Sequence, residues 1–176
     1  MQTHLVLTAI GADKPGLVSA LSDTIAAGGG NWLDARMANL AGKFAGILLV
    51  AVDADKVDAL TAALHKLDAE GLRLVVEKGT AEAAPRVGRT LKLELLGQDR
   101  PGIVRDISRV LAGLQISIAD FETERSSGSF SGEAMFKATA LLQVPPQLEL
   151  AQVRKALEGL ANELMVDLDL EEGPAG

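Results

Sequence analysis

Two short segments carry the residues best suited to binding a small charged molecule. The first is Gly11-Ala12-Asp13-Lys14-Pro15-Gly16-Leu17-Val18; the second, 86 residues later (97 − 11), is Gly97-Gln98-Asp99-Arg100-Pro101-Gly102-Ile103-Val104. A helix that begins in such a segment offers free N–H groups and the positive end of its dipole to an anion. The aspartate carboxylate suits a cation. We therefore predict a site for a small molecule that carries both charges.

We call these segments the first elbow (residues 11–18) and the second elbow (residues 97–104). Each follows a strand-like apolar run and opens an amphipathic helical pattern. We expect the leading glycine to let the backbone turn sharply off the strand and the proline to occupy the first helical position. The next glycine, Gly16 or Gly102, has no Cβ and leaves the helix start open to a ligand.

Residues suited to catalysis are scarce. The two histidines, His4 and His65, lie near no nucleophile or phosphate-binding motif. Acidic residues alternate with apolar ones at Asp167, Asp169 and Glu171, but no histidine accompanies them, so we predict an exposed sheet face and not a metal site. We expect no catalytic residue, no metal and no cofactor.

Composition excludes several classes of protein. With 48% hydrophobic residues in 176, the chain can bury a sizeable core. A net charge of −7 and the lack of a Lys/Arg cluster argue against direct binding of nucleic acid. No apolar run is long enough to cross a bilayer and no secretory signal is apparent. The absence of cysteine fits a cytoplasmic location.

The chain is predicted to be a duplication. At the 86-residue offset, Asp34 aligns with Asp120 and Phe44 with Phe130. Each copy reads strand-helix-strand-strand-helix-strand, with helices at 101–113 and 146–162 and a last strand at 163–171 in the second copy. We predict an α+β chain of two ferredoxin-like domains, residues 1–78 and 89–172, joined by a linker at 79–88. Each should form an antiparallel sheet with helices on one face, and the open sheet edges favour side-by-side pairing.

Asn31 opens the strand that follows the first helix, and we expect its amide to face the first elbow. The elbow, the apolar helix and this asparagine together resemble the ACT domain, a βαββαβ regulatory module of amino-acid metabolism. The resemblance implies that ligand contacts come from the elbow and from the residue opening the second strand, at an interface between paired domains. By position, these residues are Gly11, Asp13, Gly16 and Asn31 in the first copy and Gly97, Asp99, Gly102 and Ser117 in the second.

The resemblance further implies a sensor of glycine or another small amino acid. Such a protein, possessing two ACT copies and no other domain, would control transcription through a protein partner such as an activator, and a homodimer is compatible with this role. Two alternatives remain open. The chain could be a ligand-independent interaction module acting on an enzyme of amino-acid metabolism, or a fragment of an enzyme that begins with an ACT-type segment, as formyltetrahydrofolate deformylases do.

Overall fold

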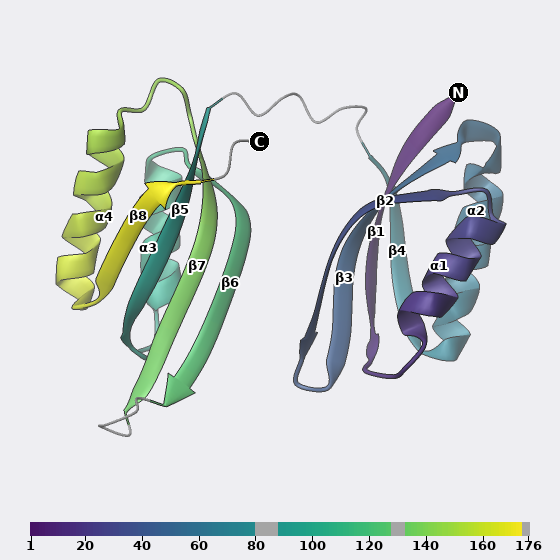
Figure 1. Cartoon of the computed structure of the whole chain (residues 1–176), viewed down its shortest axis with the longest axis horizontal. Helices are drawn as coiled ribbons and strands as arrows, with labels where there is room; N and C mark the ends of the chain where they lie inside the picture. The colour runs from purple at the N-terminus through teal and green to yellow at the C-terminus, as the bar shows by residue number, and fades with distance from the viewer. Residues whose placement is uncertain (80–87, 128–132, 174–176) are drawn as a thin grey trace. The chain divides into compact units, whose positions relative to one another are not determined.

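The computed structural model describes residues 1–79, 88–127 and 133–173. The chain divides into two compact units, Met1–Ala84 and Pro85–Gly176, each of which is described by itself (Figure 1). The first unit contains β1 (Gln2–Ala12), α1 (Leu17–Ala27), β2 (Asn31–Leu40), β3 (Lys43–Asp53), η1 (Ala54–Lys56), α2 (Val57–His65), η2 (Lys66–Glu70) and β4 (Leu72–Lys78). The second contains β5 (Arg89–Gln98), α3 (Ile103–Gly113), β6 (Ser117–Ser127), β7 (Ala134–Val144), α4 (Leu150–Leu164) and β8 (Asp167–Glu172). Apart from Gly79 and Gly88, the predicted linker lies outside the described residues.

Each unit is one four-stranded sheet with its two α-helices on one face (Figure 1). The strand orders are β2-β3-β1-β4 and β6-β7-β5-β8, and every pair of neighbouring strands is antiparallel. This arrangement confirms the predicted α+β class and the pair of ferredoxin-like units. The other face of each sheet carries no helix, and we call these the first open face and the second open face.

Each unit has its own hydrophobic core between the sheet and its helices. In the first unit, alternate residues of β1 such as Leu5 and Leu7 are fully buried against the helices. Val57, Leu60, Leu64 and Leu67 recur at helical spacing, which predicts one apolar face, and all four are buried. No polar side chain of the described residues is buried, so both cores are entirely apolar.

The repeat does not keep one offset along the whole chain. Asp34 and Asp120 do correspond, because both follow the same irregularity in strand pairing. Phe130 lies outside the described residues, and the prediction that it matches Phe44 is wrong. Gly11 pairs with Phe44 and Gly97 with Phe136, which places the third strands 92 residues apart (136 − 44). The reason is a longer second hairpin, since only residues 41 and 42 separate β2 from β3.

The last helix and strand also differ from their predicted bounds. Helix α4 begins at Leu150, not at 146, because a turn follows Pro145, whose carbonyl accepts a hydrogen bond from the Leu148 N–H at 3.0 Å. Glu149 is the N-cap and forms a reciprocal capping box with Gln152. The helix ends where Met165 adopts a left-handed conformation (φ 53°), so β8 begins at Asp167 and not at 163.

The alternation in β8 follows the predicted pattern. Asp167, Asp169 and Glu171 are exposed on the second open face, whereas Leu170 is buried in the core. No group of three or more acidic, histidine or cysteine side chains among the described residues is arranged to hold a metal ion. None of the helices described is both long and apolar enough to cross a membrane.

Candidate functional site

The first elbow is held in place by backbone hydrogen bonds. After β1 ends at Ala12, the N–H of Asp13 donates to the carbonyl oxygen of Gly42 in the β2–β3 turn at 3.1 Å. Gly16 is the N-cap of α1, and its carbonyl accepts the first helical hydrogen bond from Ala20 at 2.9 Å. The second elbow repeats the arrangement, with Asp99 bonded to Ala134 and with Gly102 as the N-cap of α3.

In both elbows the residue that caps the helix is a glycine, and the proline lies before it. Pro15 and Pro101 precede the N-caps, so the prediction that they occupy the first helical position is wrong. The caps are Gly16 and Gly102, with φ of 90° and 95°. Residues with a Cβ adopt this conformation at a cost of about 1–2 kcal/mol, which explains the glycines. A cap without a side chain also leaves the first N–H groups of the helix without a capping partner.

The leading glycines pack closely and do not make the turn. Gly11 lies inside β1, where it pairs with Phe44 and Leu72. A Cβ on Gly11 would stand 2.5 Å from the carbonyl oxygen of Gly71, and one on Gly97 would stand 2.3 Å from Cγ1 of Val166. These glycines therefore allow the last segment of each unit to lie against the first strand. The prediction that they turn the chain off the strand is wrong.

The two elbow aspartates have different surroundings. The Asp99 carboxylate forms an ion pair with the guanidinium of Arg125 on β6 at 2.6 Å. The Asp13 side chain makes no hydrogen bond or ion pair with any residue that the structure describes, and it does not cap α1. The residue at the register position of Arg125 in the first unit is Asn39, which carries no charge. Only the first elbow therefore presents an uncompensated carboxylate.

A hollow of about 310 Å³ lies beside the end of β1 and reaches the first two residues of the first elbow. It is lined by Ile10, Gly11, Ala12, Lys43, Asp68, Gly71 and Arg73. Lys43 pairs with Ala12 and Arg73 with Ile10, and the corresponding positions of the second unit hold Met135 and Asp167. Two cationic side chains that could meet a carboxylate thus line this hollow, together with the Asp68 carboxylate, and the matching positions of the second unit hold no cation.

Asn31 is not at the first elbow. Asn31 pairs with Ala51, which pairs with His4, so Asn31 is in the row of His4 near the start of β1. Gly11 of the elbow pairs with Phe44, which pairs with Asn39, so the residue of β2 in the elbow's row is Asn39. Seven residues of β1 separate these rows (11 − 4), or roughly 24 Å at the rise of a strand. The expectation that the amide faces its own elbow is wrong, because α1 returns along the sheet and β2 starts beside the beginning of β1.

Ser117 has the same placement in the second unit. It pairs with Gln143, which pairs with Thr90 near the start of β5, far from Gly97. There it lines a hollow of about 390 Å³ together with Gln115 and Gln143. The amide of Gln143 donates to the Thr90 hydroxyl oxygen at 2.9 Å. The structure therefore brings together the elbow residues of each unit but separates them from Asn31 and Ser117.

Sequence reasoning missed Asn39, Lys43, Asp68 and Arg73. Asn39 could have been found at the 86-residue offset as the counterpart of Arg125 (125 − 86). The other three could not, because the hollow depends on which residues of β3, η2 and β4 stand opposite the end of β1, and that register is set by the lengths of turns.

Comparison with known proteins agrees with this architecture. The model of the ACT domain family matches residues 3–77 and again residues 89–171. The glycine cleavage system transcriptional repressor of Escherichia coli (strain K12) is 24% identical over 164 residues, covering 93% of this chain and 86% of the relative.

Two crystal structures resemble the whole chain. A protein of unknown function from Galdieria sulphuraria has a TM-score of 0.87 and 29% identity, and the match covers 99% of this chain and 100% of that one. A protein provisionally assigned as a glycine cleavage system transcriptional repressor has a TM-score of 0.74 and 20% identity, with 99% of both chains covered. At that identity the second likeness concerns the fold alone. The chain belongs to the ACT domain family and contains two ACT domains in tandem.

Proposed function

We propose that this chain is a regulatory protein that senses glycine or another small amino acid at the first elbow and acts on transcription through a protein partner. The observation that carries the proposal is the difference between the two elbows. Asp13 has no side-chain partner among the described residues and Lys43 and Arg73 line the adjoining hollow, whereas Asp99 is neutralised by Arg125. The role in transcription is supported by the similarity to the repressor of Escherichia coli.

A free amino acid is a zwitterion, so its site must satisfy a carboxylate and an ammonium group close together. The uncapped N–H groups at the start of α1, together with Lys43 and Arg73, suit the carboxylate. Asp13 follows Ala12, which lines the hollow, and its carboxylate suits the ammonium group. In this proposal Gly16 keeps the helix start open, since nothing lies within 4 Å of where its Cβ would be.

Asn31 contributes only through a second domain. It lies at the opposite end of the sheet from its own elbow, so any ligand it contacts is held by the elbow of another ACT domain. The second set of proposed ligand residues, Gly97, Asp99, Gly102 and Ser117, takes a secondary place because the Asp99 carboxylate already has a partner. The cytoplasmic location stays a prediction.

Titration calorimetry of the purified protein against a panel of amino acids tests the sensing role. We expect saturable binding of one small amino acid at one site per chain, because one elbow has free charges. A des-amino or des-carboxy analogue of that amino acid is the matched control and should bind more weakly, since each lacks one charge. Absence of binding across the panel would favour the ligand-independent interaction module.

The isolated protein is expected not to bind operator DNA at physiological salt. With a net charge of −7 it can neutralise few phosphates, so its binding would release few of the counterions that surround the DNA. An electrophoretic mobility assay with and without the bound amino acid measures this, and an established DNA-binding protein on the same fragment is the control. A sequence-specific shift by the purified protein alone would contradict control through a partner.

A further inference from the structure

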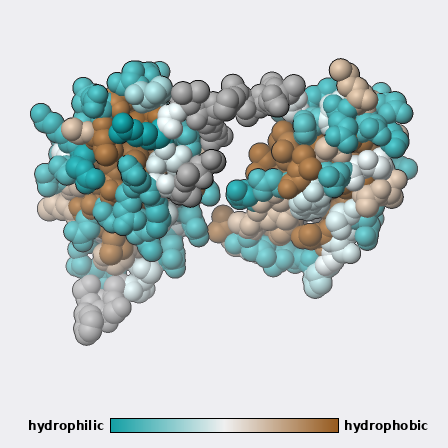
Figure 2. Space-filling view, turned by 45° about the horizontal axis from the view of Figure 1, so that its top comes forward, coloured by the Kyte–Doolittle hydropathy of each residue, from teal (hydrophilic) through white to brown (hydrophobic). Residues whose placement is uncertain are grey.

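The first open face is unusually apolar for an exposed sheet surface. The inner strands β1 and β3 and the edge strand β4 have apolar residues on this outward side: Val6, Ile10, Ala45, Ile47, Leu49 and Val75. Ile10, Ile47 and Val75 are 43%, 50% and 57% exposed. Hydrophobic residues gather on this unit, at the right of Figure 2. Contiguous apolar surface of this kind marks an interaction site.

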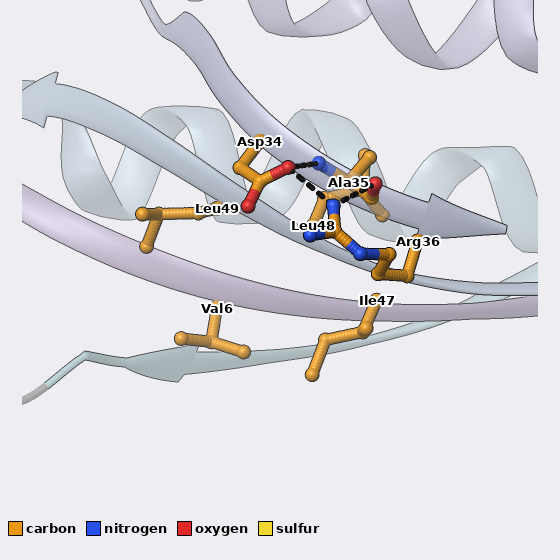
Figure 3. Close-up of a pocket in the computed structure, with 7 residues that line it drawn as sticks. All are labelled: Val6, Asp34, Ala35, Arg36, Ile47, Leu48 and Leu49. Atoms are coloured by element: carbon orange, nitrogen blue, oxygen red, sulfur yellow. Dashed lines mark hydrogen bonds and ion pairs between the residues drawn. The ribbon is translucent and has the colours of Figure 1, made fainter. Parts of the chain in front are cut away.

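A shallow hollow of about 200 Å³ runs across this face between β1, β3 and β2 (Figure 3). Val6, Ile47 and Leu49 contribute apolar side chains to it. At its margin the Arg36 guanidinium donates to the Asp34 carboxylate at 2.7 Å, so these two charges neutralise each other. The hollow can therefore receive apolar side chains from a partner without leaving an unpaired charge beside them.

The second open face, built on the same topology, has the opposite character. Its register places seven carboxylates on the outward side, with two lysines among them: Glu94, Asp120, Glu122, Glu124, Asp167, Asp169 and Glu171, with Lys92 and Lys137. Asp169 occupies the position of Val75, and Thr139 that of Ile47. The apolar character thus belongs to one face and is not a general property of the repeat.

We infer that the first open face is the docking surface for a second copy of this chain, with two such faces packed sheet on sheet. Four strands about 4.8 Å apart and some nine residues long give on the order of 600 Å² per copy. Stable interfaces bury about 800 Å² per partner, so this face supports a dimer that depends on concentration. The inference shares Arg73 with the proposed amino-acid site but does not need a ligand, so it is tested by the oligomeric state of the ligand-free chain.

At the β4 edge of the face, two charges are self-complementary. On β4, Arg73 lies two residues before Val75 and Glu77 two residues after it, so all three are on the same face. Val75 pairs with Thr8, and Thr8 pairs with Ile47, so these three residues form one row across the sheet. A two-fold axis that runs across the strands along this row places Arg73 of one copy opposite Glu77 of the other, twice per dimer. The same axis places Arg36, which pairs with Ile47, opposite Arg36 of the other copy, and each of these guanidinium groups is already paired with its own Asp34. Two copies of the second open face would instead oppose carboxylates to carboxylates.

Sedimentation equilibrium of the full chain over a range of concentrations tests this dimer. We expect Ile47→Asp and Val75→Asp each to raise the dimer dissociation constant by about a hundredfold or more, because each would bury an unpaired charge. Arg73→Glu and Glu77→Arg are each expected to raise it by about tenfold. The double variant Arg73→Glu/Glu77→Arg should restore dimerisation, because it exchanges the two charges.

Thr139→Asp, at the matching position of the second sheet, is the control and should leave the dissociation constant unchanged. Circular dichroism melts identify any variant that fails to fold, and the charge-exchange pair involves only exposed side chains. A wild-type chain that stays monomeric at the highest concentration overturns the inference. So does a dimer that is insensitive to Ile47→Asp and Val75→Asp, since it would assemble through another surface.

Discussion

Gly11→Ala is expected to destabilise the first domain by about 1–3 kcal/mol, the range of overpacking in a well-packed site. The new Cβ would lie 2.5 Å from the Gly71 carbonyl oxygen and 3.4 Å from Cδ1 of Leu72. The oxygen belongs to backbone, which cannot rotate away, so the end of β1 must separate from the start of β4. For a domain of this size each kcal/mol lowers the melting temperature by roughly 4–8 °C.

Differential scanning calorimetry measures this effect, because two domains with separate cores can give separate transitions. The matched control is Gly159→Ala in α4, where nothing lies within 4 Å of the new Cβ. That variant should raise stability by roughly 0.5–1 kcal/mol through helix propensity. An unchanged melting profile for Gly11→Ala would show that the strands have room to adjust and that Gly11 is not a packing glycine.

Gly11 is also one of the residues that the resemblance to the ACT domain places in contact with a ligand. The structure gives it a packing role that is sufficient to require glycine. Gly16 differs, since its surroundings are open and its φ of 90° alone requires glycine. A Gly16→Val substitution therefore strains the backbone as well as blocking the helix start, and a loss of binding in that variant would not isolate the approach of the ligand.

The sequence predicts the elements of this fold better than it predicts the site. Apolar periodicity predicts that Leu17, Val18, Leu21 and Ile25 share one face of the first helix. Leu17, Leu21 and Ile25 are buried, whereas Val18 is 45% exposed. Strand alternation likewise separated Leu170 from its acidic neighbours. These features are local, since they depend on the period of a helix or a strand and not on what lies opposite.

The site depends on register and direction, which are not local. The expected position of Asn31 beside the elbow depends on where the first helix, which folds back, delivers the chain. That helix runs along the whole sheet and ends at its far end, in the row of His4. Phe136 was missed as the counterpart of Phe44 because the second hairpin is longer. The ion pair of Asp99 with Arg125 joins the residue that follows β5 to a residue on β6, and these strands are not neighbours in the sheet. The spacing of apolar residues in a helix or a strand does not reveal strand register or the end of the sheet at which a helix ends.

Asp13→Ala is expected to weaken amino-acid binding by roughly 10- to 150-fold, because a hydrogen bond to a charged group contributes about 1.5–3 kcal/mol. Asp13→Asn should weaken it less, since the amide oxygen still accepts a hydrogen bond from the ammonium group. The melting temperature should not change in either variant, because the Asp13 side chain neither caps α1 nor pairs with any described residue. Titration calorimetry and thermal melts on the same samples measure both quantities.

Asp99→Ala is the matched control for Asp13→Ala. It removes the corresponding carboxylate of the second elbow, which already pairs with Arg125 at 2.6 Å, and it should leave the affinity unchanged. Its effect on stability should be at most about 1 kcal/mol, the range of a solvent-exposed ion pair. If Asp13→Ala lowers the melting temperature while the affinity stays the same, Asp13 has a structural role and the ligand is held elsewhere. If Asp99→Ala weakens binding as much as Asp13→Ala, both elbows bind the ligand. In that case the ion pair between Arg125 and Asp99 must break when the ligand binds.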